Sequence, residues 1–294
     1  MSSEVYRFNV GDFECVVISD GTFSYPQPAG DAFINFFVNA PREHLKRALG
    51  GHGIDLERWE SYLSPFLCLL IDTDRSLVLV DTGAGGISPT TGRLLPNLRA
   101  EGVEPEDIDV VVLTHGHPDH IGGNIDDENE PAFPNARYVM QRDEWDFWTS
   151  EPDLSKLKID EHGKETLLSV ARRNLLPIQG RLDPIEGGVD IVPDVRAIPA
   201  PGHTPGHMAV EVASGGEKLI CISDTVLHPV HMERPGWYSA VDVAPMDVAA
   251  TRRRILDRAA AEGAQVLAFH FPFPGLGHVT RKEDAWKWNP IERS

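Results

Sequence analysis

The sequence predicts an α/β fold, and three observations support that prediction. Short apolar runs with strand character alternate with helical segments in both halves of the 294-residue chain. Hydrophobic residues make up 41% and charged residues 24%, which is ordinary for a folded chain with a large core. No obvious linker separates the halves. We therefore expect one domain over residues 1–294, in which two similar halves pack face to face.

The first half opens with a predicted antiparallel hairpin. Strands are expected at Tyr6–Val10 and Phe13–Ser19, because Gly11-Asp12 joins them and Asp20-Gly21 is a turn signal that ends the second. The later strands of this half are expected at Leu67–Asp72, Leu77–Val80 and Val110–Leu113. The last of these is fully apolar, which is typical of a strand buried on both faces.

The second half continues the alternation. Residues 141–177 are expected to be helical, with Pro177 as the stop. A second helix is expected at Met246–Glu262, where apolar residues share one face and Gly263 ends the helix. Strands are expected at Val195–Ile198, Met208–Val212, Leu219–Ile222 and Val266–Phe269.

Charge and cysteine content exclude several classes of function. Lys and Arg total 27 against 45 Asp and Glu, so the net charge is −18, which argues against a nucleic-acid partner and against an anionic membrane surface. No signal peptide and no membrane-spanning run is visible, so a cytoplasmic protein is expected. The three cysteines lie far apart in apolar runs and are expected to be buried thiols.

A cluster of metal-binding residue types follows the buried strand at 110–113. His115, His117, Asp119 and His120 occupy four of six consecutive positions. In an extended turn alternate side chains point to the same side, so His115 and His117 can bind one ion while the other two face a second. Imidazole and carboxylate ligands suit zinc, and also manganese, cobalt or iron. The spacing therefore predicts a centre of two divalent metal ions.

Two such ions need further ligands, and the later chain offers three at the ends of predicted strands. His203 follows the strand at 195–198, Asp224 follows that at 219–222, and His270 follows that at 266–269. A strand end delivers a side chain rigidly into a loop-lined cleft. His207, close to His203, is expected to satisfy a backbone carbonyl rather than to bind metal.

This pattern resembles the metallo-β-lactamase fold superfamily, from Asp81-Thr82-Gly83 to His270. The resemblance implies a four-layer αββα sandwich with the site along one edge. It also implies that one metal is bound by His115, His117 and His203, the other by Asp119, His120 and His270, with Asp224 bridging. Asp81 resembles the family carboxylate that orients the ligands.

Motifs outside the ligands resemble a narrower branch, the methyl parathion hydrolases and the related quorum-quenching lactonases. They are Val10–Glu14, Ser19–Thr22, Leu79–Ala84, Phe133–Ala136, Asp146–Trp148 and Phe273–His278. By that likeness Trp148 is a substrate-pocket aromatic, and a homodimer is expected. Residues 84–88 lack an aromatic found in that branch, and Leu167 and Leu168 stand where another is expected.

Two further pocket residues are proposed from position. Phe36 lies in an aromatic-rich segment, residues 24–40, that also contains Phe33 and is either a core flap or a pocket wall. His228 follows Asp224 closely enough to face the pocket.

The expected reaction is hydrolysis of a small lactone, aryl ester or phosphotriester. Water activated between two metals is the nucleophile, and the predicted catalytic residues are Asp119 and Asp224, the latter relaying a proton to the leaving group.

Other functions remain open at this stage. A thioesterase of the glyoxalase II type shares the ligands, and a non-catalytic metal-binding module of the same fold is conceivable. A nuclease would need a basic surface, and a flavodiiron oxygen reductase carries Glu where this chain has His117.

Overall fold

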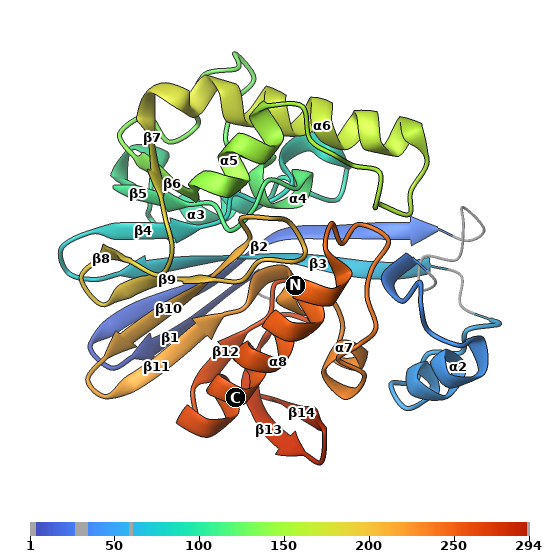
Figure 1. Cartoon of the computed structure of the whole chain (residues 1–294). Coiled ribbons are helices and arrows are strands. Elements are labelled where there is room, and N and C mark those ends of the chain that lie inside the picture. The colour runs from blue at the N-terminus through green and yellow to red at the C-terminus, as the bar shows by residue number, and fades with distance from the viewer. Residues whose placement is uncertain (1–3, 27–34, 59–60, 293–294) are drawn as a thin grey trace.

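The computed structural model describes residues 4–26, 35–58 and 61–292, and its centre is a pair of seven-stranded β-sheets (Figure 1). The first sheet follows chain order: β1 (Val5–Val10), β2 (Phe13–Pro26), β3 (Ser61–Asp72), β4 (Leu77–Val80), β5 (Val110–Val112), β6 (Arg137–Gln141) and β7 (Leu182–Ile185). The second runs from the last strand back to β8: β14 (Ala285–Pro290), β13 (Leu276–Lys282), β12 (Gln265–Leu267), β11 (Glu217–Cys221), β10 (Met208–Ser214), β9 (Val195–Pro199) and β8 (Asp190–Val192). Each half of the chain thus builds one sheet.

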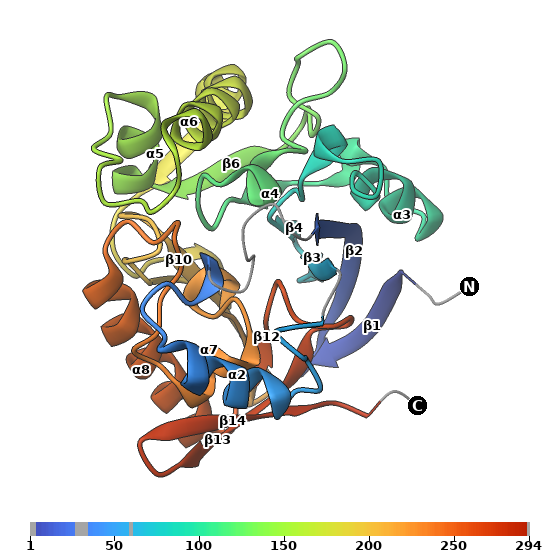
Figure 2. The ribbon, with the colours of Figure 1, turned by 90° about the vertical axis from the view of Figure 1, so that its right-hand side faces the viewer.

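Helices cover the outer faces of the two sheets, which gives four layers (Figures 1 and 2). Those over the first sheet are α3 (Leu94–Ala100), α4 (Pro118–Ile121), α5 (Arg142–Thr149) and α6 (Glu161–Leu175). The second sheet is covered by α8 (Pro245–Glu262), and α2 (Arg42–Gly50) and α7 (Pro229–Glu233) lie to one side. Single 3₁₀ turns are η1 (Gly85–Ile87), η2 (Pro105–Asp107), η3 (Leu176–Arg181) and η4 (Ser223–Thr225). The predicted αββα sandwich is confirmed. Within the described ranges, no helix combines the length and apolar character needed to cross a membrane.

Three apolar layers hold the sandwich together. Between the sheets, Val17 and Leu69 of the first face Val210 and Leu219 of the second. Two outer layers join each sheet to its own helices. Each fully buried Val or Leu contributes about 1.5 to 3 kcal/mol relative to exposure. The three cysteines are buried and free, as expected.

Parallel strands set the position of the site. β4 pairs with β5 and β5 with β6 in parallel, and in the other sheet β11 pairs in parallel with β12. The carboxyl ends of these strands therefore meet along one edge of the sandwich, where their following loops come together.

The chain departs from the prediction at Asp20 and Gly21, which do not end the second strand. β2 continues to Pro26 through a bulge between Ser19 and Gly21. The bulge points the Asp20 carboxylate inward, where it accepts hydrogen bonds from the backbone N–H groups of Ala84 (2.8 Å) and Leu94 (2.9 Å). Asp-Gly serves here as a bulge, so the predicted turn was wrong.

The helix predicted over 141–177 is two helices, α5 and α6. The segment between them contains Pro152, which cannot donate a helical hydrogen bond, and Asp160 caps α6 by accepting from the Gly163 N–H at 2.7 Å. The helix predicted at 246–262 matches α8, and Gly263 ends it with a φ of 63°.

Candidate metal centre

The loop after β5 carries four of the predicted ligands to the sheet edge. Its start is fixed by Asp81, whose two oxygens accept hydrogen bonds from the Thr114 N–H and hydroxyl, both at 2.8 Å. Asp81 lies at the end of β4 with a φ of 61°, a left-handed conformation that is costly for a non-glycine residue. Pro118 then begins the single turn of α4, which places His120 and Asp119 beyond His117.

The second half brings three more residues to the same edge. His203 lies in the loop after β9, Asp224 lies within η4 directly after β11, and His270 follows β12. Because β11 and β12 are parallel, Asp224 and His270 leave the sheet at the same end.

The seven predicted ligands form two adjoining groups. The first ligand group comprises His115, His117, His203 and Asp224, and the second comprises Asp119, His120 and His270. Within each group the candidate ligand atoms all lie within 4.8 Å of one another. Asp224 Oδ2 is 3.2 Å from His203 Nε2 and 3.3 Å from His270 Nε2, so this carboxylate lies between the groups.

The donor atoms of these groups fit a pair of cations. His115 Nε2 and His117 Nε2 are buried without a hydrogen-bond partner, and the buried His120 Nε2 lies 3.2 Å from Asp224 Oδ1. Such an unsatisfied group costs about 1 to 3 kcal/mol, so several in one place call for a ligand. His117 Nδ1 also faces His203 Nε2 at 2.9 Å, a close approach of two basic nitrogens. A shared cation relieves both problems, and imidazole with carboxylate is a donor set that suits zinc.

Burial and neighbouring charges shift the pKa values of the ligand histidines in opposite directions. Burial, reinforced by neighbouring histidines, lowers the pKa of His115 and of His117 well below the usual value. Burial opposes protonation of His120 too, but the Asp224, Asp119 and Asp81 carboxylates together raise the pKa of His120 well above its usual value. Although burial acts the other way, His270 and His120 hold the pKa of Asp224 well below its usual range. Without a cation, the cluster therefore combines neutral His115 and His117 with a protonated His120 beside the ionised Asp224, and a bound cation would take the place of that proton.

Three ligand histidines are oriented through their other ring nitrogen. His120 Nδ1–H donates to Asp81 Oδ2 at 2.8 Å, which matches the orienting role predicted for Asp81. His203 Nδ1–H donates to Asp242 Oδ1 at 2.6 Å. His270 Nδ1 lies 3.0 Å from Ser64 Oγ and 3.2 Å from the Pro65 carbonyl. These contacts leave Nε2 of each ring as the ligand atom. The sequence analysis missed Asp242 and Ser64.

His207 takes the structural role expected of it. Its Nδ1–H donates to the Ala200 carbonyl at 3.0 Å, and its Nε2 accepts from the Asp224 N–H at 3.1 Å. Burial lowers the pKa of His207 to about 3, so the ring is neutral and can accept that bond. His207 thereby positions the backbone of Asp224.

Trp148 does not line an open pocket, contrary to the prediction. Its ring is fully buried, packs against His117 at 5.5 Å between ring centres, and donates its indole N–H to Glu144 Oε1 at 2.7 Å. The residue supports the ligand loop from behind, because α5 points it into the layer between helix and sheet. A substrate would have no access to it.

An aromatic group flanks the site, formed by Tyr25, Phe36 and Tyr62. Ring centres of Tyr25 and Phe36 are 5.6 Å apart, and those of Phe36 and Tyr62 are 5.5 Å apart. Tyr62 lies two residues before Ser64 on the same face of β3, and Ser64 Oγ is 3.0 Å from His270 Nδ1, so this group lies on the side of the second ligand group. Phe36 is half-buried within it, whereas Phe33 lies outside the described residues. The sequence analysis missed the two tyrosines.

His228 lies behind this aromatic group. Its ring contacts Tyr62 and Phe37, and its Nδ1 accepts the Val230 N–H at 3.2 Å at the start of α7. Burial lowers the pKa of His228 to about 3. It therefore caps α7 as a neutral ring.

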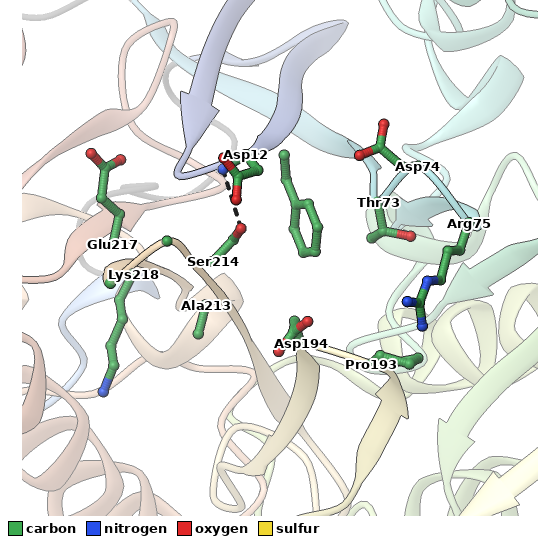
Figure 3. Close-up of a pocket in the computed structure, with 13 residues that line it drawn as sticks. Asp12, Thr73, Asp74, Arg75, Pro193, Asp194, Ala213, Ser214, Glu217 and Lys218 are labelled. Carbon is green, nitrogen blue, oxygen red and sulfur yellow. Dashed lines mark hydrogen bonds between the residues drawn. The ribbon is translucent and has the colours of Figure 1, made fainter.

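A hollow of about 710 Å³ lies at the opposite end of the sandwich (Figure 3). Turns between strands line it, with Asp12, Arg75 and Asp194 among the charged residues. Strands β4 and β11 begin at this end and finish at the ligand edge, so the hollow is remote from the predicted chemistry. None of the predicted site residues lines it.

Comparisons with known proteins give the same picture. The model of the metallo-beta-lactamase superfamily matches residues 65–270. An N-acyl homoserine lactonase from Bacillus thuringiensis is 29% identical over 180 residues, which is 54% of this chain and 63% of that protein. The chain thus covers less than two thirds of the length of the curated lactonases it matches.

Solved structures match over nearly the whole chain. AidC, a dizinc quorum-quenching lactonase in complex with the product N-hexanoyl-L-homoserine, is 28% identical with a TM-score of 0.91, over 99% of both chains. The hydrolase AbOPH of the beta lactamase superfamily is 29% identical with a TM-score of 0.88, over 100% of this chain and 99% of that one.

Proposed function

Because the chain belongs to the metallo-beta-lactamase superfamily, we propose that it is a metal-dependent hydrolase with two divalent cations that opens the lactone ring of N-acyl homoserine lactones or closely related small esters. Zinc is the metal that the donor set and the dizinc neighbour favour.

One observation carries the proposal, namely the meeting of the two ligand groups at Asp224. Seven histidine and aspartate side chains from both halves of the chain converge there, and the buried Nε2 atoms of His115 and His117 have no hydrogen-bond partner. A binding module without catalysis has no need of two adjoining groups that share a carboxylate, whereas a hydrolase does.

In the proposed centre, His115, His117 and His203 would hold one cation and Asp119, His120 and His270 the other, with Asp224 available to both. When bound, such a pair of cations polarises an ester carbonyl and lowers the pKa of water, so that hydroxide is available near neutral pH.

The two aspartates divide the remaining work. Asp224 is almost fully buried and contacts His120, His203 and His270, so its main role is to hold the centre together. Asp119 has 22% of its side chain exposed and lies 3.5 Å from His270 Nε2. It is therefore the aspartate that can exchange a proton with a leaving alkoxide and then with solvent.

Apolar walls complete the site. Phe269 stacks on His120 at 3.8 Å between ring centres, and Phe66 contacts His270 at 5.6 Å. Excluding water here strengthens each electrostatic interaction with the developing charge. The aromatic group of Tyr25, Phe36 and Tyr62 supplies an apolar surface suited to an acyl chain.

The residues present favour a lactone over a phosphotriester as the substrate. The aromatics expected for a phosphotriester pocket are absent at 84–88, and Leu167 and Leu168 pack instead against the core beside the helices. Phosphotriesters therefore form the comparison class in the test rather than the proposed substrate.

The test combines metal analysis with a substrate panel. Purified protein should contain two equivalents of a transition metal and should hydrolyse N-acyl homoserine lactones faster than aryl esters, phosphotriesters, β-lactams and a glutathione thioester. The Asp224→Ala and His117→Ala variants should lose all of these activities together. A protein with no stoichiometric metal, or one that prefers the thioester, would refute the proposal.

A further inference from the structure

Glu144 is a fully buried carboxylate that lies outside both ligand groups and joins the loops that carry them. Its Oε1 accepts a hydrogen bond from the Gly116 N–H at 2.8 Å, and its Oε2 accepts one from the Gly206 N–H at 2.9 Å. Oε1 also accepts the Trp148 indole N–H at 2.7 Å. One side chain on α5 thus receives donors from two loops that are 90 residues apart in sequence.

The two loops that meet at Glu144 carry the histidines of the first ligand group. Gly116 lies between His115 and His117, and Gly206 lies three residues after His203. The first loop follows β5 of the first sheet, and the other follows β9 of the second sheet. The carboxylate therefore spans the boundary between the two halves of the sandwich, directly behind the first cation site.

Close packing leaves these contacts little freedom. A Cβ at Gly206 would lie 2.2 Å from the Glu144 backbone nitrogen, and a Cβ at Gly116 would lie 2.3 Å from the Trp148 ring. Both glycines are thus required by the approach of α5. The loops can reach their positions only when Glu144 and Trp148 are seated beneath them.

We propose that Glu144 is a positioning residue that fixes the separation of His115 and His117 from His203, and so sets the affinity of the first ligand group for its cation. This inference rests on the proposed metal centre. It assigns no contact between Glu144 and the cation or the substrate.

The chemistry of the contact requires a carboxylate. Each oxygen receives a backbone N–H, which can only donate, so each oxygen must be an acceptor. Glutamine has the same shape, but its NH₂ group would face a backbone N–H, and one of the two loops would lose its partner. The second ligand group is not anchored in this way, because His120 and His270 are held through Asp81 and Ser64.

The decisive experiment compares Glu144→Gln with Asp143→Asn. The second variant makes the same change of charge one residue earlier in α5, at an exposed position. Zinc retention is measured by dialysis against graded chelator, and anomalous diffraction identifies which ion remains. Amide hydrogen exchange of Gly116 and Gly206 is measured on the metal-free proteins.

Glu144→Gln should weaken binding at the first ligand group by about 10- to 100-fold, leave the second group unchanged, and speed the exchange of one or both glycine amides. Asp143→Asn should change none of these quantities. Unchanged affinity in Glu144→Gln, or equal weakening at both groups, would overturn the inference while leaving the proposed function intact. A wild-type protein that binds no zinc would instead refute the metal centre itself.

If Glu144→Gln does not fold, the metal-free wild-type protein still decides the question. The Gly116 and Gly206 amides should then exchange as slowly as amides within α5. Exchange at the rate of an open loop would show that the carboxylate does not hold them, and the inference would fail.

Discussion

The two ligand groups are built differently, although they share an edge and a carboxylate. Every member of the first group is buried, and its loops are anchored through backbone amides by Glu144 and through His203 by Asp242. The second group includes Asp119, which is partly exposed. His120 is held at its ring by Asp81 and at its backbone carbonyl by Thr82, and His270 is held at its ring by Ser64 and the Pro65 carbonyl.

One proposed cation site is therefore supported from the interior of the sandwich, whereas the other faces outward. The aromatic group of Tyr25, Phe36 and Tyr62 lies on the side of the second ligand group. We therefore propose that substrate access and proton exchange belong to the second group, and that the first group provides a rigid base for it.

The largest effect is expected from Asp224→Asn, because Asp224 is the only one of the seven ligands placed between the groups. The amide keeps the shape but removes the charge that both sites share, so both ions should be lost and lactone hydrolysis should fall by about a thousandfold or more. Metal content and kcat are the measurements. Asp194→Asn, in the remote hollow, is the matched control and should retain both. Loss of a single ion would place Asp224 in one group only.

Smaller effects are expected from Asp81→Asn and Asp242→Asn, each on the binding of a different cation. Asp81 orients His120 of the second group, whereas Asp242 orients His203 of the first. Each variant should weaken its own cation by about 10- to 100-fold and spare the other. Chelator competition followed by anomalous diffraction checks the assignment. If both variants release the same ion first, the two groups are not independently supported.

The loss of folding stability in acid must be distinguished from the release of metal in acid. His228 allows the loss of stability to be measured separately. Its pKa is lowered to about 3, so the unfolded chain binds a proton below about pH 6.5 that the folded chain excludes. Stability should therefore fall as the pH drops from 6.5 toward 3. His228→Asn keeps an acceptor for the Val230 N–H and removes the titration. At pH 5 the variant should lose about 2 kcal/mol less than wild type, relative to pH 7, in urea unfolding. An equal loss in both proteins would contradict this.

The smallest effect is expected at Phe36. Phe36→Ala opens the aromatic group on the side of the second ligand group, so it should lower kcat/KM for long-chain acyl lactones about fivefold, or about 1 kcal/mol. Short-chain lactones and metal content should be unaffected. A uniform loss for all chain lengths would mean that Phe36 supports the fold rather than the acyl chain.

The metal ligands could be predicted from the sequence because each is marked by a short local pattern. His115, His117, Asp119 and His120 lie within six positions, and His203, Asp224 and His270 each follow a recognisable strand. Strand ends meet at one edge in an α/β sandwich, which explains why residues that follow different strands converge. The resemblance to the superfamily supplied their division between two metals.

The supporting residues could not be predicted in the same way. Asp242, Ser64 and Glu144 act on partners 28 to 206 residues distant, and nothing in the spacing links them. Trp148 was assigned to the pocket by likeness, but the direction of α5 buries it. Local pattern specifies which side chains bind, whereas tertiary packing specifies what holds them in place.

The order of the ligands along the chain has a consequence for synthesis. A nascent polypeptide that has emerged through β11 presents five of the seven ligands, and Asp224 and His270 follow only afterwards. The complete centre therefore cannot form until synthesis has passed β12 and His270. Stable metal capture then coincides with the docking of the two halves, and metal content reports how many molecules have matured.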